Sequence, residues 1–323
     1  MLLRCAILDD YQRVALSMAN WSSIEAKVEI DCFNDGVADT DALIARLADY
    51  EIIVAMRERT VFDAERLGRL PKLKLLITTG MANASIDMAA AARLGITVAG
   101  TGGFVGSAAE LTWALLMAMV RHIPSEVANF RAAKDPWQLS VGRDLRGLTL
   151  GVAGLGKLGQ QVAAYGRAFG MNVIGWSRSN TPENSAELGI GYAATLDELL
   201  RAADIASLHL TLNAETTGII GKRELSLMKP GAILLNTSRG PLVDEQSLIA
   251  ALESGHLGGA GLDVFDAEPL PTNHAFRRLA NVVATPHLGY VTEETYRIFY
   301  GDAVEDIAGW IDGKPLRVLN AEH

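Results

Sequence analysis

The sequence has few cysteines, no excess of positive charge and no long apolar run. Only Cys5 and Cys32 are present, which is too few for a disulfide framework, and their spacing does not match a metal site. Lys and Arg number 29 against 38 Asp and Glu, a formal net charge of −9, so the chain lacks the basic footprint that nucleic acids and anionic membranes require. We expect no metal, no nucleic-acid partner and no membrane partner.

The apolar segments are all short. The longest helical one, residues 111–120, is well below the roughly 20 residues that a membrane-spanning helix needs. Residues 1–10 contain too short an apolar core for a signal peptide and are typical of a first strand that ends in acidic residues. These features predict a cytoplasmic protein.

Short runs rich in Val, Ile and Leu alternate with Ala-rich helical stretches, a rhythm that predicts parallel βαβ units. With 323 residues, two domains are expected. The predicted fold class is therefore α/β, with two Rossmann-like domains, each a doubly wound parallel sheet, and a cleft between them. Strands are expected at residues 6–8, 52–54, 75–78, 97–99, 149–153, 173–176, 205–208, 232–236, 259–263 and 282–284. Helices are expected at residues 39–49, 86–94, 107–122, 158–169 and 292–312.

The last helix, residues 292–312, is too isolated along the chain to form a domain by itself. We expect it to pack back on the N-terminal unit, which makes that domain discontinuous. The prediction is one domain of residues 1–103 plus 290–323 and a second of residues 104–289. After the helix at 107–122, an irregular stretch rich in Arg, Lys, Pro and Trp is expected.

A glycine motif lies between the predicted strand 149–153 and the predicted helix 158–169. Its residues are Gly154, Leu155, Gly156, Lys157, Leu158 and Gly159. In the dinucleotide-binding fingerprint the first glycine makes the tight turn, the second lets the backbone approach the pyrophosphate, and the third allows close helix–strand packing. The same stretch also matches the opening of a P-loop, but Leu158 stands where that motif requires Ser or Thr for magnesium. A dinucleotide site is therefore predicted.

The segment after the second strand of this unit reads Ser177-Arg178-Ser179. NAD-specific sites place an acid here, about 20 residues after the motif, to bind the ribose 2′-hydroxyl. No acid is present, and Arg178 would attract a 2′-phosphate. The cofactor is predicted to be NAD or NADP, with NADP favoured; the alternative is that Arg178 is only a solvated loop residue.

Three further polar residues, Arg239, Glu268 and His287, follow predicted strands, at the sheet edge where open α/β folds bind ligands. With the motifs around them, the sequence resembles the D-isomer-specific 2-hydroxyacid dehydrogenase family. The resemblance extends from the Thr79-Gly80 loop to Gly289. It rests on the segment 225–240, which ends in Asn236-Thr237-Ser238-Arg239-Gly240, and on Glu268-Pro269 and Pro286-His287 after it.

The resemblance implies hydride transfer between a nicotinamide and a small 2-keto or 2-hydroxy acid. Arg239 would hold the substrate carboxylate and polarise its carbonyl, and His287 would be the general acid and base. Glu268 would orient His287 and favour its protonated form. The remaining cofactor contacts implied are His209, Leu210, Thr237, Asp263 and Gly289, with Asp263 at the nicotinamide carboxamide.

The resemblance also assigns residues 1–103 plus 290–323 to substrate binding and residues 104–289 to dinucleotide binding. The substrate carboxylate would bind to Gly80, Met81 and Ala82. This loop departs from the Gly-rich, Asp-containing pattern of the family, and Thr211 replaces a common Pro, so the identity of the acid does not follow from relatives.

Two other hypotheses remain open at this point. One is an NAD(H)-sensing scaffold of the corepressor type on the same fold, although no basic interaction segment is visible. The other is an oxidoreductase with unrelated chemistry. The apolar helix from Ser107 and the stretch 131–143 would leave apolar side chains exposed in a monomer, so we expect a homodimer.

Overall fold

The computed structural model describes residues 2–104 and 106–321; the ends of the predicted domain ranges at residues 1, 322 and 323, and residue 105, lie outside it. The chain forms two compact units. Unit 1 comprises Met1–Phe104 and Val291–His323, and unit 2 comprises Val105–Tyr290. Each unit contains a parallel sheet with helices packed on it, which confirms the predicted α/β fold class.

The sheet of unit 1 has the strand order β2-β1-β3-β4-β5. Its strands are β1 (Leu3–Ile7), β2 (Val28–Cys32), β3 (Ile52–Ala55), β4 (Leu75–Thr78) and β5 (Thr97–Gly100). The helices of this unit are α1 (Thr40–Leu47), α2 (Ala64–Gly68), α3 (Met88–Arg93) and α11 (Glu293–Ile311), with short 3₁₀ turns η1 (Ala15–Ser17) and η2 (Trp21–Ser23).

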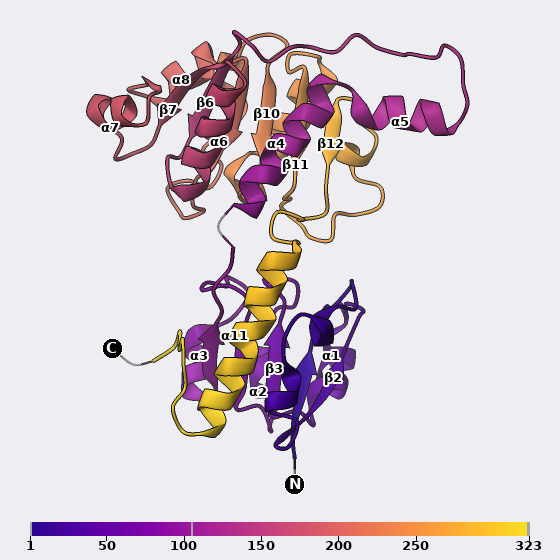
Figure 1. The fold of residues 1–323 in the computed structure, drawn as a ribbon, viewed down its shortest axis with the longest axis vertical. Coiled ribbons are helices and arrows are strands. Elements are labelled where there is room, and N and C mark those ends of the chain that lie inside the picture. Colours follow the sequence, from indigo (N-terminus) through magenta and orange to yellow (C-terminus); the bar gives the residue numbers. More distant parts are fainter. Residues whose placement is uncertain (1, 105, 322–323) are drawn as a thin grey trace. The chain divides into compact units, whose positions relative to one another are not determined.

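The C-terminal helix α11 belongs to unit 1, and Figure 1 shows it beside the strands of that unit. Thr292 caps its first turn by accepting a hydrogen bond from the backbone N–H of Thr295. The ring of Tyr300, which is fully buried, packs against Trp21 with centroids 6.3 Å apart. The segment after α11 pairs with β5, since the N–H of Gly100 donates to the carbonyl of Arg317. Helix α11 and the segment that follows it thus pack within unit 1.

A buried acid, Asp306, lies on α11. Its side chain is fully buried; Oδ1 accepts from Arg317 Nε at 3.0 Å, and Oδ2 has no hydrogen-bond partner among the described residues. Burial raises the pKa of Asp306 to about 7, reinforced by the nearby charges of Asp302 and Glu305, although Arg317 acts in the opposite direction. The folded state therefore holds a proton on Asp306 at pH values where the unfolded chain has lost it.

Asp306→Asn is expected to weaken the pH dependence of stability. Between about pH 4 and pH 7 only the folded state of the wild type keeps this proton, so its free energy of unfolding should fall by up to about 1.4 kcal/mol per pH unit from this group. Asn keeps an acceptor for Arg317 and cannot ionise. Urea unfolding at pH 5, 6, 7 and 8 measures both slopes. Parallel pH profiles for the two proteins would contradict the assignment.

The sheet of unit 2 has the strand order β12-β11-β10-β9-β6-β7-β8. Its strands are β6 (Thr149–Ala153), β7 (Asn172–Trp176), β8 (Gly191–Tyr192), β9 (Ile205–Leu208), β10 (Ile233–Asn236), β11 (Gly259–Leu262) and β12 (Val282–Ala284). Its helices are α4 (Ser107–Val120), α5 (Ile123–Arg131), α6 (Lys157–Ala168), α7 (Pro182–Glu187), α8 (Leu196–Ala202), α9 (Lys222–Leu227) and α10 (Glu245–Glu253), with 3₁₀ turns η3 (Gly240–Leu242) and η4 (Ala275–Arg277).

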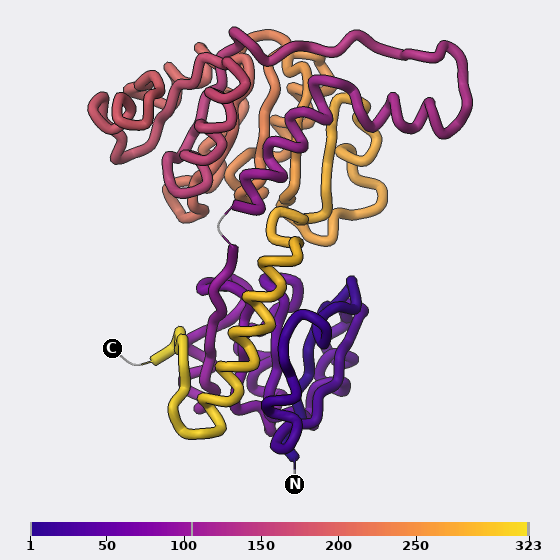
Figure 2. The backbone as a smooth tube through the Cα atoms, in the orientation of Figure 1, coloured from indigo at the N-terminus to yellow at the C-terminus, as the bar shows by residue number. Residues whose placement is uncertain are grey.

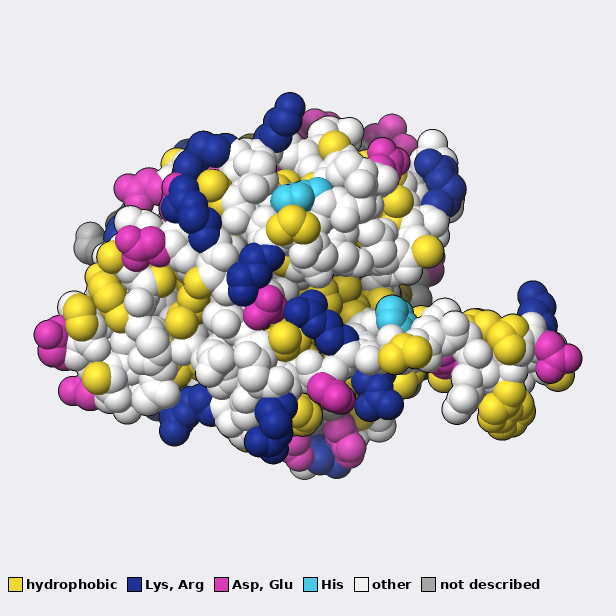
Figure 3. All heavy atoms as spheres, turned by 90° about the horizontal axis from the view of Figure 1, so that it is seen from above, with side chains coloured by type: hydrophobic (Ala, Val, Ile, Leu, Met, Phe, Trp, Pro, Cys, Tyr) yellow, Lys and Arg dark blue, Asp and Glu magenta, His cyan; other side chains and the backbone are white. Residues whose placement is uncertain are grey.

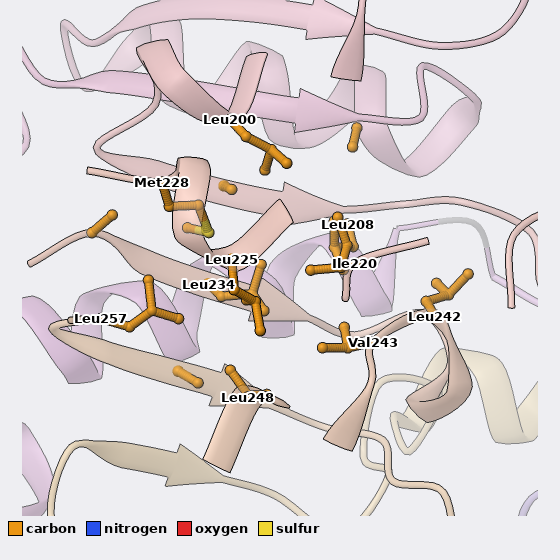
Figure 4. Close-up of a cluster of buried hydrophobic side chains, with 14 of the residues drawn as sticks. Leu200, Leu208, Ile220, Leu225, Met228, Leu234, Leu242, Val243, Leu248 and Leu257 are labelled. Atoms are coloured by element: carbon orange, nitrogen blue, oxygen red, sulfur yellow. The ribbon is translucent and has the colours of Figure 1, made fainter. Parts of the chain in front are cut away.

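Both faces of this sheet are covered. Helices α4 and α6 pack over one face, around a core that includes Leu116, Val152 and Val162. Helices α8, α9 and α10 cover the other face, and Figure 4 shows their leucines and Met228 meeting the strands there. The strand order reverses between β9 and β6, so the carboxyl ends of these two strands border the crevice where such sheets bind ligands.

The prediction of one helix at residues 107–122 was wrong in part. Helix α4 ends at Val120, His122 takes a left-handed conformation with φ of 52°, and α5 then begins with Pro124 in its first turn. Proline suits a first turn because its missing N–H would have no intrahelical partner there. Figure 2 shows that the chain then runs from the end of α5 to β6, and residues 132–148 contain no helix or strand.

Strands β2 and β8, both at sheet edges, were not predicted from the sequence. Strand β2 alternates apolar residues with Glu29 and Asp31, and its burial is only partial. Edge strands contact one neighbour instead of two and so need fewer apolar residues. Among residues 2–104 and 106–321, none of the helices has the length and hydrophobicity that a membrane-spanning segment needs.

Candidate active site

The glycine turn joins β6 to α6, with each glycine in a different environment. Gly154 has a φ of +99°, and a Cβ there would lie 2.4 Å from the carbonyl oxygen of His209. A Cβ on Gly159 would lie 1.9 Å from the Gly154 carbonyl, so close packing of helix on strand excludes a side chain. A Cβ on Gly156 would meet nothing within 4 Å. Gly156, at the N-cap of α6, thus leaves open space where the first helical N–H groups point.

Beyond β7, Ser177, Arg178 and Ser179 form a turn closed by a hydrogen bond from Asn180 N–H to the Ser177 carbonyl. The Arg178 side chain is 81% exposed and forms an ion pair with Glu215, which lies in the loop after β9. Arg178, which is predicted to bind a 2′-phosphate, therefore already pairs with the carboxylate of Glu215 from another loop.

Beyond β9, the His209 ring lies against the sheet. Its Nε2 is 2.8 Å from Ser207 Oγ, and its backbone N–H donates to Ala153, the last residue of β6. Desolvation lowers the pKa of His209 to about 4, so the imidazole is neutral at physiological pH. His209 and Leu210 thus border the glycine turn as uncharged groups.

Beyond β10, Asn236 stabilises the turn that carries Arg239. Its Nδ2 donates to the Arg239 carbonyl at 2.8 Å, and its Oδ1 accepts from Ser238 N–H at 3.1 Å. A Cβ on Gly240 would lie 2.1 Å from the carbonyl carbon of Phe265. Only glycine allows this contact, which brings the Arg239 turn against the loop that carries Glu268.

Beyond β11, the buried carboxylate of Asp263 holds the loop that carries His287. Oδ1 accepts from Thr285 Oγ1 at 2.6 Å and from Leu288 N–H at 2.7 Å, and Oδ2 accepts from Gly289 N–H at 2.7 Å. Burial raises the pKa of Asp263, although these three hydrogen bonds oppose the shift. The residues on both sides of His287 are therefore anchored to one side chain.

His287 and Glu268 form a hydrogen-bonded pair. Nδ1 of His287 lies 2.7 Å from Oε2 of Glu268, and Oε1 of Glu268 accepts from Phe265 N–H at 2.9 Å. Burial alone would raise the pKa of Glu268, but the hydrogen bond and charge of His287, with Phe265 and Arg239, lower it below its usual value. Because a carboxylate only accepts, Nδ1 carries a hydrogen and Nε2 remains for proton exchange.

The predicted substrate loop lies in unit 1, after β4. Gly80 has a φ of +91°, and its N–H donates to Thr101 Oγ1 at 2.8 Å. The side chain of Met81 is exposed, and Ala82 is exposed beside it. This backbone geometry makes Gly80 the turn residue of the loop.

Comparisons with known proteins identify the family. Residues 113–289 match the family model described as the NAD binding domain of D-isomer specific 2-hydroxyacid dehydrogenases. The chain is 41% identical over 270 residues to the glyoxylate reductase of Aeropyrum pernix, covering 80% of each protein. This chain belongs to the D-isomer-specific 2-hydroxyacid dehydrogenase family. The predicted family and enzyme class are thus confirmed: it is an NAD-dependent oxidoreductase that acts on the CH–OH group of a 2-hydroxy acid.

Two further relatives support this assignment. The D-3-phosphoglycerate dehydrogenase of Mycobacterium tuberculosis is 40% identical over 272 residues, which cover 83% of this chain and 51% of that protein. The crystal structure of a phosphoglycerate oxidoreductase from Vibrio cholerae matches with a TM-score of 0.91 and 38% identity, covering 97% of this chain and 100% of that one. The relatives are named for different substrates, glyoxylate and 3-phosphoglycerate.

Three residues that contact predicted site residues within their own unit were not predicted from the sequence. In unit 1, Arg57 lies over Gly80, since a Cβ on Gly80 would meet its Nη1 at 1.8 Å. In unit 2, Thr112 of α4 shares a 2.6 Å hydrogen bond with Thr237, and Glu215 pairs with Arg178. Arg57 follows a buried strand, as Arg239 does, and that position was a usable signal. Thr112 lies within an apolar helix and gave no signal.

The hydroxyl of Thr112 donates to the Ala108 carbonyl at 2.7 Å, so the Thr237 hydroxyl is the donor in the bond between the two threonines. The lone pairs of Thr237 Oγ1 remain as acceptors. Within residues 2–104 and 106–321, no group of three or more His, Cys, Asp or Glu side chains is arranged to hold a metal ion.

Proposed function

We propose that this dehydrogenase interconverts a small 2-keto acid and the D-2-hydroxy acid, with His287 as the general acid and base. The observation that carries this proposal is the 2.7 Å contact between His287 Nδ1 and Glu268 Oε2. It orients the ring and leaves Nε2 for proton exchange. During reduction, Nε2 of His287 would donate its proton to the carbonyl oxygen, and during oxidation it would accept the hydroxyl proton.

Arg239 is proposed to bind the substrate carboxylate and polarise the carbonyl. A guanidinium suits this role because it forms two parallel, charge-assisted hydrogen bonds with a carboxylate. The Asn236 and Gly240 contacts that shape its turn support the assignment. Gly80, Met81 and Ala82 are proposed to bind the carboxylate through backbone amides, and Arg57 beside Gly80 supplies a positive charge there.

The residues of the glycine turn fit a dinucleotide. The open space at Gly156 admits a pyrophosphate close to the N-terminus of α6, where N–H groups favour negative charge. His209, Leu210, Thr237 and Gly289 are proposed as further contacts, and Asp263 as a contact to the carboxamide. When bound, the reduced nicotinamide supplies the hydride.

We further propose that Arg178 admits NADP(H) as well as NAD(H). Support comes from the absence of an acid at the end of β7 and from the exposure of the guanidinium. Arg178→Gln is expected to raise the ratio of the NADPH Kd to the NADH Kd by about tenfold, since a charge-assisted contact to phosphate is lost. Nicotinamide fluorescence titration measures both constants. An unchanged ratio would exclude the role of Arg178.

The substrate proposal is tested by following the absorbance of NADH and NADPH across a panel of 2-keto acids. Glyoxylate, hydroxypyruvate, pyruvate and phenylpyruvate span the relevant sizes. Turnover of one or more of them supports the proposal and indicates the size of the pocket. Tight binding of cofactor without turnover of any acid would favour the NAD(H)-sensing scaffold instead.

We also propose that the protein is a cytoplasmic homodimer and that residues 123–143, here called the arm, form the interface. Figure 3 shows hydrophobic side chains gathered on this projecting segment. Six large apolar side chains of the arm are exposed: Ile123, Val127, Phe130, Trp137, Leu139 and Val141. Such a patch on a soluble protein is typical of an interaction surface.

Combining Phe130→Asp with Trp137→Ser is expected to give a monomer. These two side chains are 67% and 74% exposed, and their rings contact each other edge to face at 5.7 Å. Light scattering should find about twice the chain mass for the wild type and for the control Leu94→Ser, whose side chain is exposed in unit 1. A wild type that stays monomeric at all concentrations would refute the dimer.

A further inference from the structure

The ion pair between Arg178 and Glu215 connects the two loops on either side of β6. Arg178 follows β7 and Glu215 lies in the loop after β9, and these strands flank β6 in the sheet. The two residues are 37 positions apart in the chain, and their side chains are 81% and 73% exposed. The pair therefore joins the loops beside the strand that leads into the glycine turn.

The backbone at Glu215 is held in place by its own loop. Asn213 Oδ1 accepts from the N–H groups of Glu215 at 2.9 Å and Thr216 at 3.1 Å. Thr216 Oγ1 donates to the Thr211 carbonyl at 2.7 Å, and Thr217 Oγ1 donates to the Asn213 carbonyl at 2.8 Å. These bonds restrict the loop that presents the carboxylate to Arg178. Forming a surface ion pair costs conformational entropy. Because the backbone at Glu215 is already ordered, that cost is lower for this pair.

A 2′-phosphate and the Glu215 carboxylate would compete for the same guanidinium. The phosphate adds about −1.5 to −2 charges and binds Arg through the same bidentate geometry as a carboxylate. To bind the phosphate, the Arg178 guanidinium must break its ion pair with Glu215, or it must contact both anions at once although they repel each other. A cofactor with a ribose 2′-hydroxyl makes no such demand, because the ion pair can persist beside it.

We propose that Glu215 is a specificity-determining residue that disfavours NADP(H) by acting as the counterion of Arg178. This inference rests on the proposed function, in which the dinucleotide binds at the glycine turn with its adenosine ribose near the end of β7. Arg178 allows a 2′-phosphate to bind, and Glu215 reduces the affinity for NADP(H) relative to NAD(H). The cofactor preference is set by the pair and not by Arg178 alone.

The experiment measures Kd for NADPH and NADH by nicotinamide fluorescence in the full-length wild type, Glu215→Gln, Arg178→Gln and the double variant. Glu215→Gln is expected to shift the Kd ratio about fivefold toward NADPH, the effect of losing one exposed charge interaction. In the Arg178→Gln background the same change should shift the ratio less than twofold, because the residue through which it acts is gone. The control Glu253→Gln alters net charge equally at the exposed end of α10 and should leave the ratio at its wild-type value.

An unchanged ratio in Glu215→Gln, with both dinucleotides bound, would overturn this inference and leave the proposed function intact. A fivefold shift that persists without Arg178 would also overturn it, since Glu215 would then repel the phosphate directly. Failure of both dinucleotides to bind any of the proteins would overturn the proposed function together with this inference. Raising the salt concentration should reduce the Glu215→Gln effect, as expected for exposed charges.

Discussion

Replacing His287 by alanine is expected to lower kcat for 2-keto acid reduction by about 10³-fold, with little change in cofactor affinity. Positioned acid–base groups typically contribute 10²- to 10⁴-fold, and Nε2 of His287 is the group that the Glu268 contact leaves for proton exchange. Steady-state kinetics with the best acid of the panel measures kcat, and fluorescence titration measures the cofactor Kd. A variant that keeps its rate within tenfold would exclude His287 as the proton donor.

Glu268→Gln is the matched control for the His287 assignment. Gln keeps an oxygen that can accept from Nδ1, so the ring orientation is preserved while the negative charge is lost. During proton transfer the ring carries a positive charge, and Gln cannot stabilise that charge as the carboxylate does. Steady-state kinetics should therefore show kcat lower by about tenfold in Glu268→Gln, and little further loss when the same change is added to His287→Ala. An equal loss in both backgrounds would show that Glu268 does not act through His287.

Asp263→Asn is expected to reduce kcat by about 10²-fold and to destabilise the protein by about 1–3 kcal/mol. The carboxylate accepts three hydrogen bonds from the loop that carries His287, two of them from backbone N–H groups. An amide must place its NH₂ group against one of those donors, which leaves buried groups unsatisfied. A displaced loop would misalign His287, and an error of about 1 Å in a reacting group can reduce the rate 10²-fold.

Kinetics and thermal unfolding of Asp263→Asn test this positioning role together. Thr285→Val removes only the hydroxyl donor to Oδ1 and leaves both backbone bonds, so its losses in rate and stability should be clearly smaller. If Asp263 acted only on the cofactor, the variant would change cofactor Kd while kcat at saturating cofactor stayed near the wild-type value. That outcome, or an unchanged kcat, would contradict the positioning role.

Much of the fold could be predicted because buried parallel strands appear in sequence as short apolar runs between turn residues. Strands β4, β6, β9 and β12 have the predicted limits, and the others that were predicted differ by at most a few residues at their ends. The glycine turn could also be predicted, since the steric demands at Gly154 and Gly159 allow only one residue type. These features depend on local chain properties, and a single sequence expresses them directly.

The arm, the edge strands and the substrate loop were harder to predict. The break between α4 and α5 depends on the left-handed backbone of His122, which no residue type demands. Arg57 was missed because an arginine after a strand is common in sequences. Its contact with the backbone of Gly80 is visible only in the structure. The contact of Arg57 with Gly80 joins residues that are distant in sequence.

The sequence alone shows the alternation of strands and helices, the glycine turn and the residue types that carry the chemistry. Which of these residues meet depends on the tertiary structure. It brings His287 to Glu268 across 19 residues, Asp263 to Gly289 across 26, and Arg178 to Glu215 across 37. The physical reason is that a hydrogen bond or ion pair requires both partners within a few ångströms. Only the packing of β6, β7, β9, β10 and β11 into one sheet brings their carboxyl-end loops together at one edge.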